Sequence, residues 1–177
     1  MINVYLTGGI HNKRKLTSLS SKTRPTSQMV RGAVFNMIDV NNKVTLDLFS
    51  GSGLYGFEAI SRGATMCYFN DQDSDAYKSI KENAKTLKEE TKTKVYKLDY
   101  KEFLRLHKDN EFDYIFIDPP YDFTDVIISD LLDRLSIYNA TLILERNKTS
   151  KIITHNNYRI IKDKTYGIKR ILIYERV

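Results

Sequence analysis

The chain has 177 residues and a formal net charge of +6 at pH 7, with 28 Lys and Arg against 22 Asp and Glu. A chain of this length most simply forms one domain that buries roughly 70% of its unfolded surface. Its single cysteine excludes an internal disulfide and a cysteine-based zinc cluster, and its three histidines are too scattered to bind a metal together.

Membrane and secretion signals do not occur in the sequence. No apolar run approaches the roughly 20 residues that a membrane helix requires. The N-terminus also lacks the apolar core of a signal peptide. We therefore expect a cytoplasmic, monomeric protein, folded as one domain over residues 1–177, with no metal and no membrane partner.

Basic residues are concentrated near the N-terminus. The first 38 residues contain six of them and no acid, whereas the other 139 balance at 22 against 22. Such a segment either tracks phosphates, as a nucleic-acid-binding arm does, or is a solvated basic face. Residues 3–6 and 15–19 predict a short hairpin around the Gly8-Gly9 turn, so residues 1–22 are expected to form a basic N-terminal extension.

An amphipathic helix is expected next. Pro25 or Thr26 can begin it, because proline suits the first turn and threonine suits a cap, and the pattern ends near Asp39. Apolar residues recur in it at helical spacing. The expected core face consists of Met29, Val30, Ala33, Val34, Met37 and Ile38.

Strand and helix patterns then alternate as far as residue 144. Apolar runs predict strands at residues 44–49, 65–70, 95–98, 112–117 and 141–144. Periodic segments predict helices at residues 53–62, 74–88, 103–106 and 127–135. Ser74 can cap the helix at 74–88. Residues 158–161 and 170–174 read as a terminal hairpin. The alternation predicts a doubly wound, Rossmann-like α/β sheet, mostly parallel, with an antiparallel C-terminal hairpin strand.

A glycine loop follows the strand at residues 44–49, in the segment L-D-L-F-S-G-S-G-L-Y-G at 46–56. Such a loop presents unpaired backbone N–H groups to a ligand at the carboxyl end of a strand. Gly51, Gly53 and Gly56 fit the dinucleotide pattern, and Asp71 falls twenty residues after Gly51, where a ribose-binding acid is found. The glycines alone do not separate a nicotinamide cofactor from S-adenosylmethionine.

Two further features favour S-adenosylmethionine. A carboxylate at Asp47 would repel a pyrophosphate but suits the cationic amino and sulfonium groups of this cofactor. The strand at 112–117 ends in Asp118-Pro119-Pro120-Tyr121, a tetrapeptide of enzymes that methylate exocyclic amines of bases. The Asp118 carboxylate and the Pro119 carbonyl can accept the two amine hydrogens, while Tyr121 can stack on an extruded base.

Four acids end successive predicted strands: Asp47, Asp71, Asp99 and Asp118. Ligands of such sheets bind outside the carboxyl ends of the strands, so one cleft could hold all four. Aspartate also ends strands simply to cap the following helix, which would explain any one of them. Four in succession beside a glycine loop make capping a poor explanation for the whole set.

Three segments, in this order, closely resemble the bacterial RsmD family: R-P-T-S-Q-M-V-R-G-A-V-F-N at 24–36, L-D-L-F-S-G-S-G-L-Y-G-F-E-A-I-S-R-G-A at 46–64 and F-D-Y-I-F-I-D-P-P-Y at 112–121. Members of that family methylate the N2 of a guanine in 16S ribosomal RNA. The resemblance implies S-adenosylmethionine as the cofactor and small-subunit ribosomal RNA, or the assembling 30S subunit, as the partner.

The resemblance also implies site residues by position. Cofactor contacts would come from Asp47, Phe49, Gly51, Ser52, Gly53, Asp71, Gln72, Asp99, Tyr100 and Asp118. The target base would be held by Asp118, Pro119, Pro120 and Tyr121, and the RNA by Lys13, Arg14, Lys15, Arg24, Thr26 and Arg31. The chain departs from the family at Gln28 and Gly32, where aspartate and glutamate are usual, and at Asp71, where glutamate is commoner.

Two alternatives stay open. An N6-adenine or N4-cytosine DNA methyltransferase would also use the Asp118–Tyr121 tetrapeptide, but the chain has no room for a separate target-recognition domain. A ribosome-assembly factor without turnover would keep the same fold. The intact glycines and acids argue against that second alternative.

Overall fold

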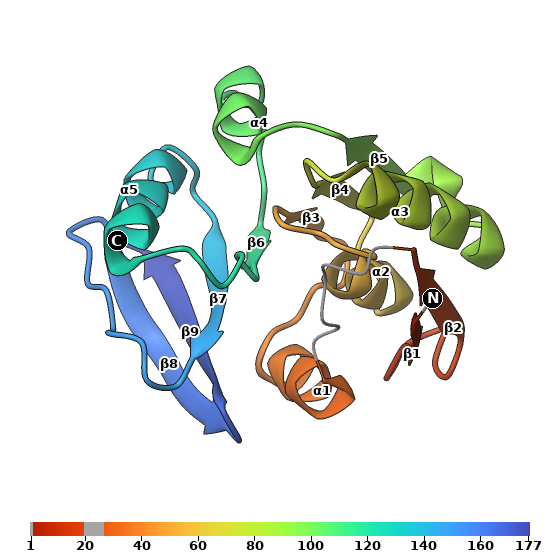
Figure 1. Cartoon of the computed structure of the whole chain (residues 1–177), viewed down its shortest axis with the longest axis horizontal. Coiled ribbons are helices and arrows are strands. Elements are labelled where there is room, and N and C mark those ends of the chain that lie inside the picture. Colours follow the sequence, from red (N-terminus) through yellow and green to blue (C-terminus); the bar gives the residue numbers. More distant parts are fainter. Residues whose placement is uncertain (1, 20–26) are drawn as a thin grey trace.

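The structure is a computed structural model that describes residues 2–19 and 27–177 (Figure 1). Within these residues a seven-stranded sheet has the order β5-β4-β3-β6-β7-β9-β8. The strands are β3 (Val44–Asp47), β4 (Met66–Asn70), β5 (Thr93–Tyr96), β6 (Tyr114–Ile117), β7 (Thr141–Asn147), β8 (Tyr158–Tyr166) and β9 (Lys169–Arg176). The first five are parallel and the last two antiparallel, which confirms the predicted doubly wound sheet with a C-terminal hairpin.

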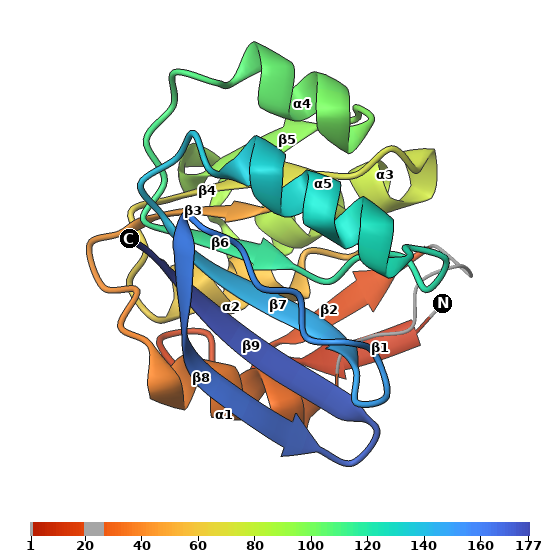
Figure 2. The same cartoon turned by 90° about the vertical axis from the view of Figure 1, so that its left-hand side faces the viewer.

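Helices cover both faces of this sheet (Figure 2). They are α1 (Gln28–Met37), α2 (Leu54–Ser61), α3 (Ser74–Leu87), α4 (Tyr100–Leu106) and α5 (Asp125–Leu135), with a single 3-10 turn at Glu90–Lys92 before β5. Side chains alternate across each strand, so Ile115 and Ile117 of β6 pack with α4 and α5, whereas Phe116 packs with α1 and α2. Because β3 lies between β4 and β6, the strand order reverses beside its carboxyl end.

The predicted N-terminal hairpin is confirmed as a separate two-stranded sheet of β1 (Ile2–Tyr5) and β2 (Lys15–Ser18). Its apolar residues Val4, Leu6 and Leu16 are buried in one cluster with α2 and α3. His11 Nε2 also lies 2.7 Å from a carboxylate oxygen of Glu89, just beyond α3. The hairpin is therefore packed onto the body and is not a loose arm.

Helix α1 differs from the prediction at its start. Ser27 caps it, accepting a hydrogen bond from the Val30 N–H at 3.1 Å, whereas Pro25 and Thr26 lie outside the described residues. The prediction that Met29 faces the core is wrong, because that side chain is 64% exposed. Val30 and Val34 are buried as predicted, and Phe35, which was not part of the predicted face, is buried with them.

Other element boundaries shift as well, for example those of α3 and β5. Asp73, not Ser74, caps α3 by accepting a hydrogen bond from the N–H of Asp75 at 2.7 Å. Strand β5 begins at Thr93 and ends at Tyr96, two residues earlier than predicted. In both places polar residues flank the element, so the spacing of apolar residues could not predict where the helix or strand begins or ends.

Candidate active site

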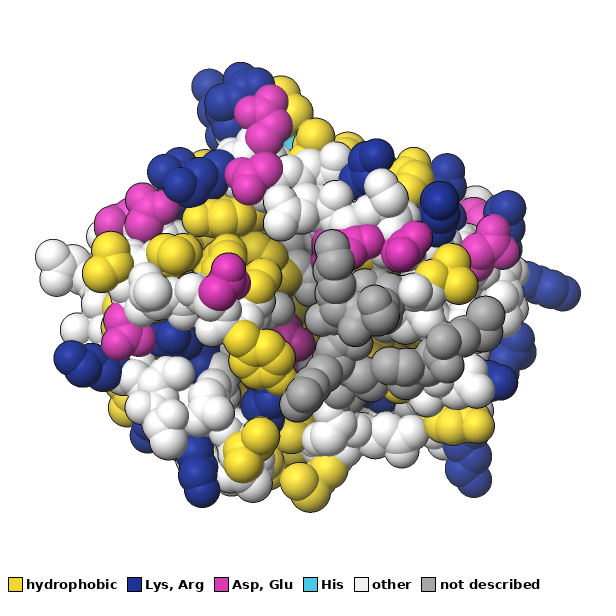
Figure 3. All heavy atoms as spheres, viewed as in Figure 1, with side chains coloured by type: hydrophobic (Ala, Val, Ile, Leu, Met, Phe, Trp, Pro, Cys, Tyr) yellow, Lys and Arg dark blue, Asp and Glu magenta, His cyan; other side chains and the backbone are white. Residues whose placement is uncertain are grey.

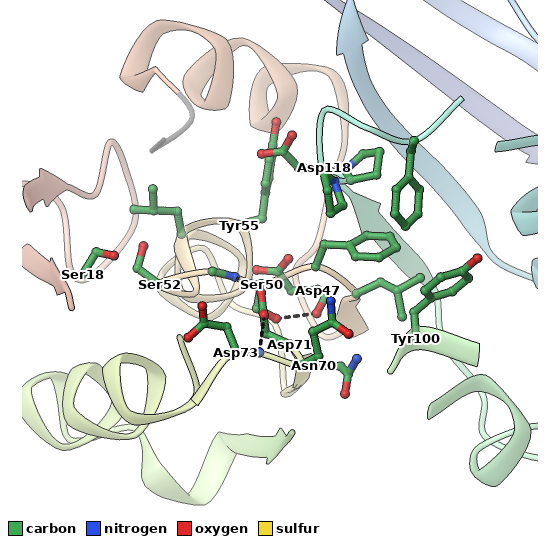
Figure 4. A pocket seen from close by; sticks show the side chains of 18 of the residues that line it. Ser18, Asp47, Ser50, Ser52, Tyr55, Asn70, Asp71, Asp73, Tyr100 and Asp118 are labelled. Atoms are coloured by element: carbon green, nitrogen blue, oxygen red, sulfur yellow. Dashed lines mark hydrogen bonds between the residues drawn. The ribbon is translucent and has the colours of Figure 1, made fainter. Parts of the chain in front are cut away.

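A cavity of about 800 Å³ lies at the carboxyl ends of β3, β4 and β6, beside the reversal of strand order (Figure 4). Asp47, Asp71, Asp99 and Asp118 all line it, so the predicted convergence of the four acids is confirmed. Its other predicted lining residues are Phe49, Gly51, Ser52, Gln72, Tyr100, Pro119, Pro120 and Tyr121. The volume is within the usual range for small-molecule sites.

The glycine loop is held to β4 by two hydrogen bonds. The Ser50 N–H donates to the Asn70 carbonyl at 3.0 Å, and the Gly51 N–H donates to Asp71 Oδ2 at 2.9 Å. Gly53, a predicted cofactor contact, is not among the residues that line the cavity. It has a φ of 87°, and a Cβ there would lie 2.7 Å from the Phe57 ring, so this position needs glycine to begin α2.

Asp47 is buried beneath this loop. Its Oδ2 accepts a hydrogen bond from the Gly56 N–H of α2 at 3.0 Å. Burial raises the pKa of the carboxyl from 3.8 to about 7; the Gly56 hydrogen bond opposes this shift and the charge of Asp71 adds to it. A cationic ligand in the cavity would therefore favour the ionised carboxylate.

Asp71 receives backbone N–H groups from both sides. Besides Gly51, the Asp73 N–H donates to its Oδ1 at 2.9 Å. Burial raises the pKa of Asp71, and these two hydrogen bonds oppose the rise. The carboxylate therefore fixes the glycine loop and still faces the cavity, where it can accept hydrogen bonds from a ligand.

Three aromatic rings form the wall next to Asp99. Phe49, Tyr100 and Phe123 lie 5.3 to 5.5 Å apart between ring centroids. Asp99 itself caps α4 by accepting a hydrogen bond from the Lys101 N–H at 2.9 Å. This part of the cavity can hold a flat aromatic ligand group. Sequence analysis did not identify Phe123 as a site residue, because it lies between the tetrapeptide and the next helix, where no motif or periodicity marks it.

The Asp118–Tyr121 segment lines another part of the cavity. Asp118 and Pro119 are partly buried, whereas Tyr121 is 72% exposed. The Lys169 Nζ atom lies 5.2 Å from the centroid of the Tyr121 ring. An exposed aromatic face beside a carboxylate and a carbonyl can receive a second planar group.

A polar chain of contacts beneath this segment was missed in the sequence. The Tyr55 hydroxyl of α2 donates to Glu145 Oε2 at 2.7 Å, and Glu145 Oε1 lies 3.2 Å from Lys169 Nζ. Glu145 is only 2% exposed. The sequence signal for this contact was a lone acid in the apolar segment L-I-L-E, because a buried carboxylate needs partners.

Arg31, predicted to contact RNA, is instead a structural residue. Its side chain is fully buried, with Nε donating to Glu58 Oε2 at 3.1 Å and Nη2 donating to the Tyr5 carbonyl. Glu58 also accepts hydrogen bonds from Thr7 and Arg62. The prediction for Arg31 is therefore wrong, since its buried guanidinium joins the hairpin, α1 and α2.

The other basic residues of the prediction fall into two groups. Lys13, Arg14 and Lys15 are exposed on the hairpin, where Arg14 also donates to the Thr86 carbonyl at 3.0 Å. Arg24 and Thr26 lie outside the described residues. Over residues 2–19 and 27–177, no cluster of three or more His, Cys, Asp or Glu could hold a metal, and no helix is long and apolar enough to cross a membrane.

Comparisons with known proteins agree with this geometry. Residues 4–175 match the model of the family "conserved hypothetical protein 95". Ribosomal RNA small subunit methyltransferase D of Haemophilus influenzae is 33% identical, with 97% of this chain and 93% of that protein aligned. A putative methylase from the same organism superposes with a TM-score of 0.80 at 28% identity, covering 99% of each chain.

An RNA methyltransferase from Salinibacter ruber, solved with S-adenosyl-L-homocysteine, has the same fold. It superposes with a TM-score of 0.69 at 16% identity, covering 86% of this chain and 94% of its own. The family match and the relatives confirm the resemblance carried by the three sequence segments. The chain belongs to the conserved hypothetical protein 95 family, which is the family of the RsmD-type ribosomal RNA methyltransferases.

Proposed function

We propose that this protein transfers a methyl group from S-adenosylmethionine to the exocyclic N2 of a guanine in small-subunit ribosomal RNA. The observation that carries the proposal is a single cavity lined by both the glycine loop and the Asp118–Tyr121 segment. A cofactor and a base amine can therefore meet in it. The name of the Haemophilus influenzae relative supports ribosomal RNA as the substrate.

The residues of the cavity fit the cofactor in charge and shape. Gly51 and Ser52 would border its methionine part, with Asp47 near the amino group and Asp71 at the ribose hydroxyls. The adenine would lie beside Asp99 and the aromatic wall. The raised pKa of Asp47 supports this placement, because a buried carboxylate of that kind gains most from a cationic ligand. When bound, the cofactor supplies a methyl group already activated by its sulfonium.

The amine would be activated by hydrogen bonds. The lone pair of an exocyclic guanine nitrogen is delocalised into the ring, which makes the nitrogen a weak nucleophile. If Asp118 and the Pro119 carbonyl accept its two hydrogens, the nitrogen is drawn toward a tetrahedral geometry and its lone pair is freed. Pro119 and Pro120 restrict the backbone angles that aim this carbonyl, and Tyr121 would stack on the base. Transfer would break the methyl–sulfur bond, leave S-adenosylhomocysteine as the product and release one amine hydrogen as a proton to Asp118 or to water. Positioning then supplies most of the catalysis.

The RNA backbone would be bound by basic side chains at the surface. In the view of Figure 3, hydrophobic side chains gather toward the middle of the face, and Lys and Arg lie mostly around its edge. Lys13, Arg14 and Lys15 are the exposed candidates on the hairpin. Phosphate contacts of this kind fix the register of a nucleic acid. We further propose that the protein acts as a monomer in the cytoplasm, on the RNA or on the assembling 30S subunit.

The Asp118→Ala variant tests the proposal. It should keep the fold and still bind the cofactor, measured by calorimetry, but lose methyl transfer by roughly 100-fold or more, because one amine hydrogen loses its acceptor. Asp122→Ala is the matched control, since it removes an exposed carboxylate just after the tetrapeptide. Turnover that is equal in the two variants would remove Asp118 from the mechanism.

The substrate assay also decides between the alternatives. Small subunits from a strain that lacks the enzyme and duplex DNA would be offered in parallel with labelled cofactor. Label in DNA alone would favour an N6-adenine or N4-cytosine methyltransferase. A calorimetric titration without any cofactor binding would favour a non-catalytic assembly factor.

A further inference from the structure

Two basic side chains hold the segment that carries Tyr121. Arg146 of β7 pairs with Asp125 at 2.8 Å and donates to the Phe123 carbonyl at 3.2 Å, which anchors the end of the segment. Lys169 of β9 lies over the Tyr121 ring at 5.2 Å. Because Tyr121 is 72% exposed, packing alone does not fix its ring, and the Lys169 ammonium contacts one face of it.

Lys169 is itself held from below. Its ammonium lies 3.2 Å from Glu145 Oε1, and the second oxygen of Glu145 accepts the Tyr55 hydroxyl at 2.7 Å. Burial lowers the pKa of Lys169, but Glu145 and Asp118 more than offset this and the pKa is raised, so the ammonium stays charged at neutral pH. A lysine tethered to a buried carboxylate has far less freedom than a surface lysine.

We propose that Lys169 is a positioning residue, which holds the Tyr121 ring by a cation–π contact so that its other face can stack on the target base beside Asp118. This inference rests on the proposed function. It assigns Lys169 no contact with the reacting atoms. Since Tyr55 lies in the first turn of α2, directly after the glycine loop, the chain of contacts also joins the cofactor loop to the base platform.

Three lysine variants test this role. Lys169→Met removes the charge and keeps most of the side-chain length, Lys169→Arg keeps the charge, and Lys164→Met removes an exposed lysine from the same hairpin. We expect Lys169→Met to lower kcat about tenfold with unchanged cofactor affinity, because the base is presented less often in the productive orientation. Lys169→Arg should restore most of kcat. Lys164→Met should leave kcat unchanged and alter at most the KM for the RNA.

A double-mutant cycle with Tyr121→Ala shows whether Lys169 acts through the ring. If it does, adding Lys169→Met to Tyr121→Ala should cause little further loss of kcat. A full additional loss in the double variant, or a kcat for Lys169→Met equal to that of Lys164→Met, would overturn the inference. Wild-type protein that transfers no methyl group in the same assay would instead refute the proposed function.

Discussion

The Asp47→Asn variant should be more stable than the wild type without ligand, yet bind the cofactor more weakly. The pKa of the buried carboxyl is raised from 3.8 to about 7, mainly by burial. Since one unit corresponds to 1.36 kcal/mol, ionised Asp47 destabilises the folded protein by at most roughly 4 kcal/mol above pH 7. Asparagine carries no charge and can still accept the Gly56 hydrogen bond.

The sign of this effect sets its pH dependence. Below about pH 4 the carboxyl is protonated in both the folded and the unfolded chain, so it contributes no difference. As the pH rises from about 4 to 7, the folded state keeps the proton that the unfolded state loses, and the wild type loses stability. The stability of the asparagine variant lacks this contribution at every pH.

Urea denaturation of both proteins at several pH values between 5 and 8, without cofactor, measures this difference. The gain in the free energy of unfolding from Asp47→Asn should grow by at least about 1 kcal/mol across that range. A difference in the free energy of unfolding that is the same at every pH would refute the raised pKa of Asp47. Calorimetry at pH 8 should show weaker binding of S-adenosylmethionine to the variant, and equal affinity would contradict the placement of Asp47 at the amino group.

Three further substitutions test the packing. Gly56→Ala should destabilise the protein in urea, since its Cβ would lie 2.2 Å from the buried Phe69 ring, and overpacking of up to about 3 kcal/mol exceeds the gain of about 1 kcal/mol in helix propensity. Gly32→Ala should instead stabilise by about 1 kcal/mol, because the nearest atom to its Cβ is 3.7 Å away; a loss of stability there would contradict the open space. Arg31→Met should cost about 3 kcal/mol in the same measurement, and a neutral effect would mean that the buried ion pair contributes nothing.

Local sequence patterns were enough to predict the sheet and the acids and glycine loop at its carboxyl edge. Asp47, Asp71, Asp99 and Asp118 each follow an apolar strand, and a parallel sheet brings all such positions to one edge. The glycine loop shows which of these strands is followed by a helix N-terminus that can face a ligand. The place of each acid at the end of a predicted strand was therefore enough to predict that the four lie together.

Partners that are distant in the sequence were not predictable in the same way. Arg31 sits in a helix with a visible apolar face, but its partner Glu58 is 27 residues away on another helix. Lys169 and Glu145 are joined only by the pairing of β7 with β9. In both pairs a lone acid in an apolar element was the only local sign, and it indicates a buried partner without saying which residue that is.

Transfer of labelled methyl from S-adenosylmethionine to small ribosomal subunits, isolated from a strain that lacks the enzyme, tests the central claim most directly. After digestion of the 16S RNA, mass spectrometry should find the label on the N2 of one guanine and nowhere else. Label on another atom or another base, or unlabelled RNA alongside protein that binds the cofactor, would contradict the joint site for cofactor and guanine.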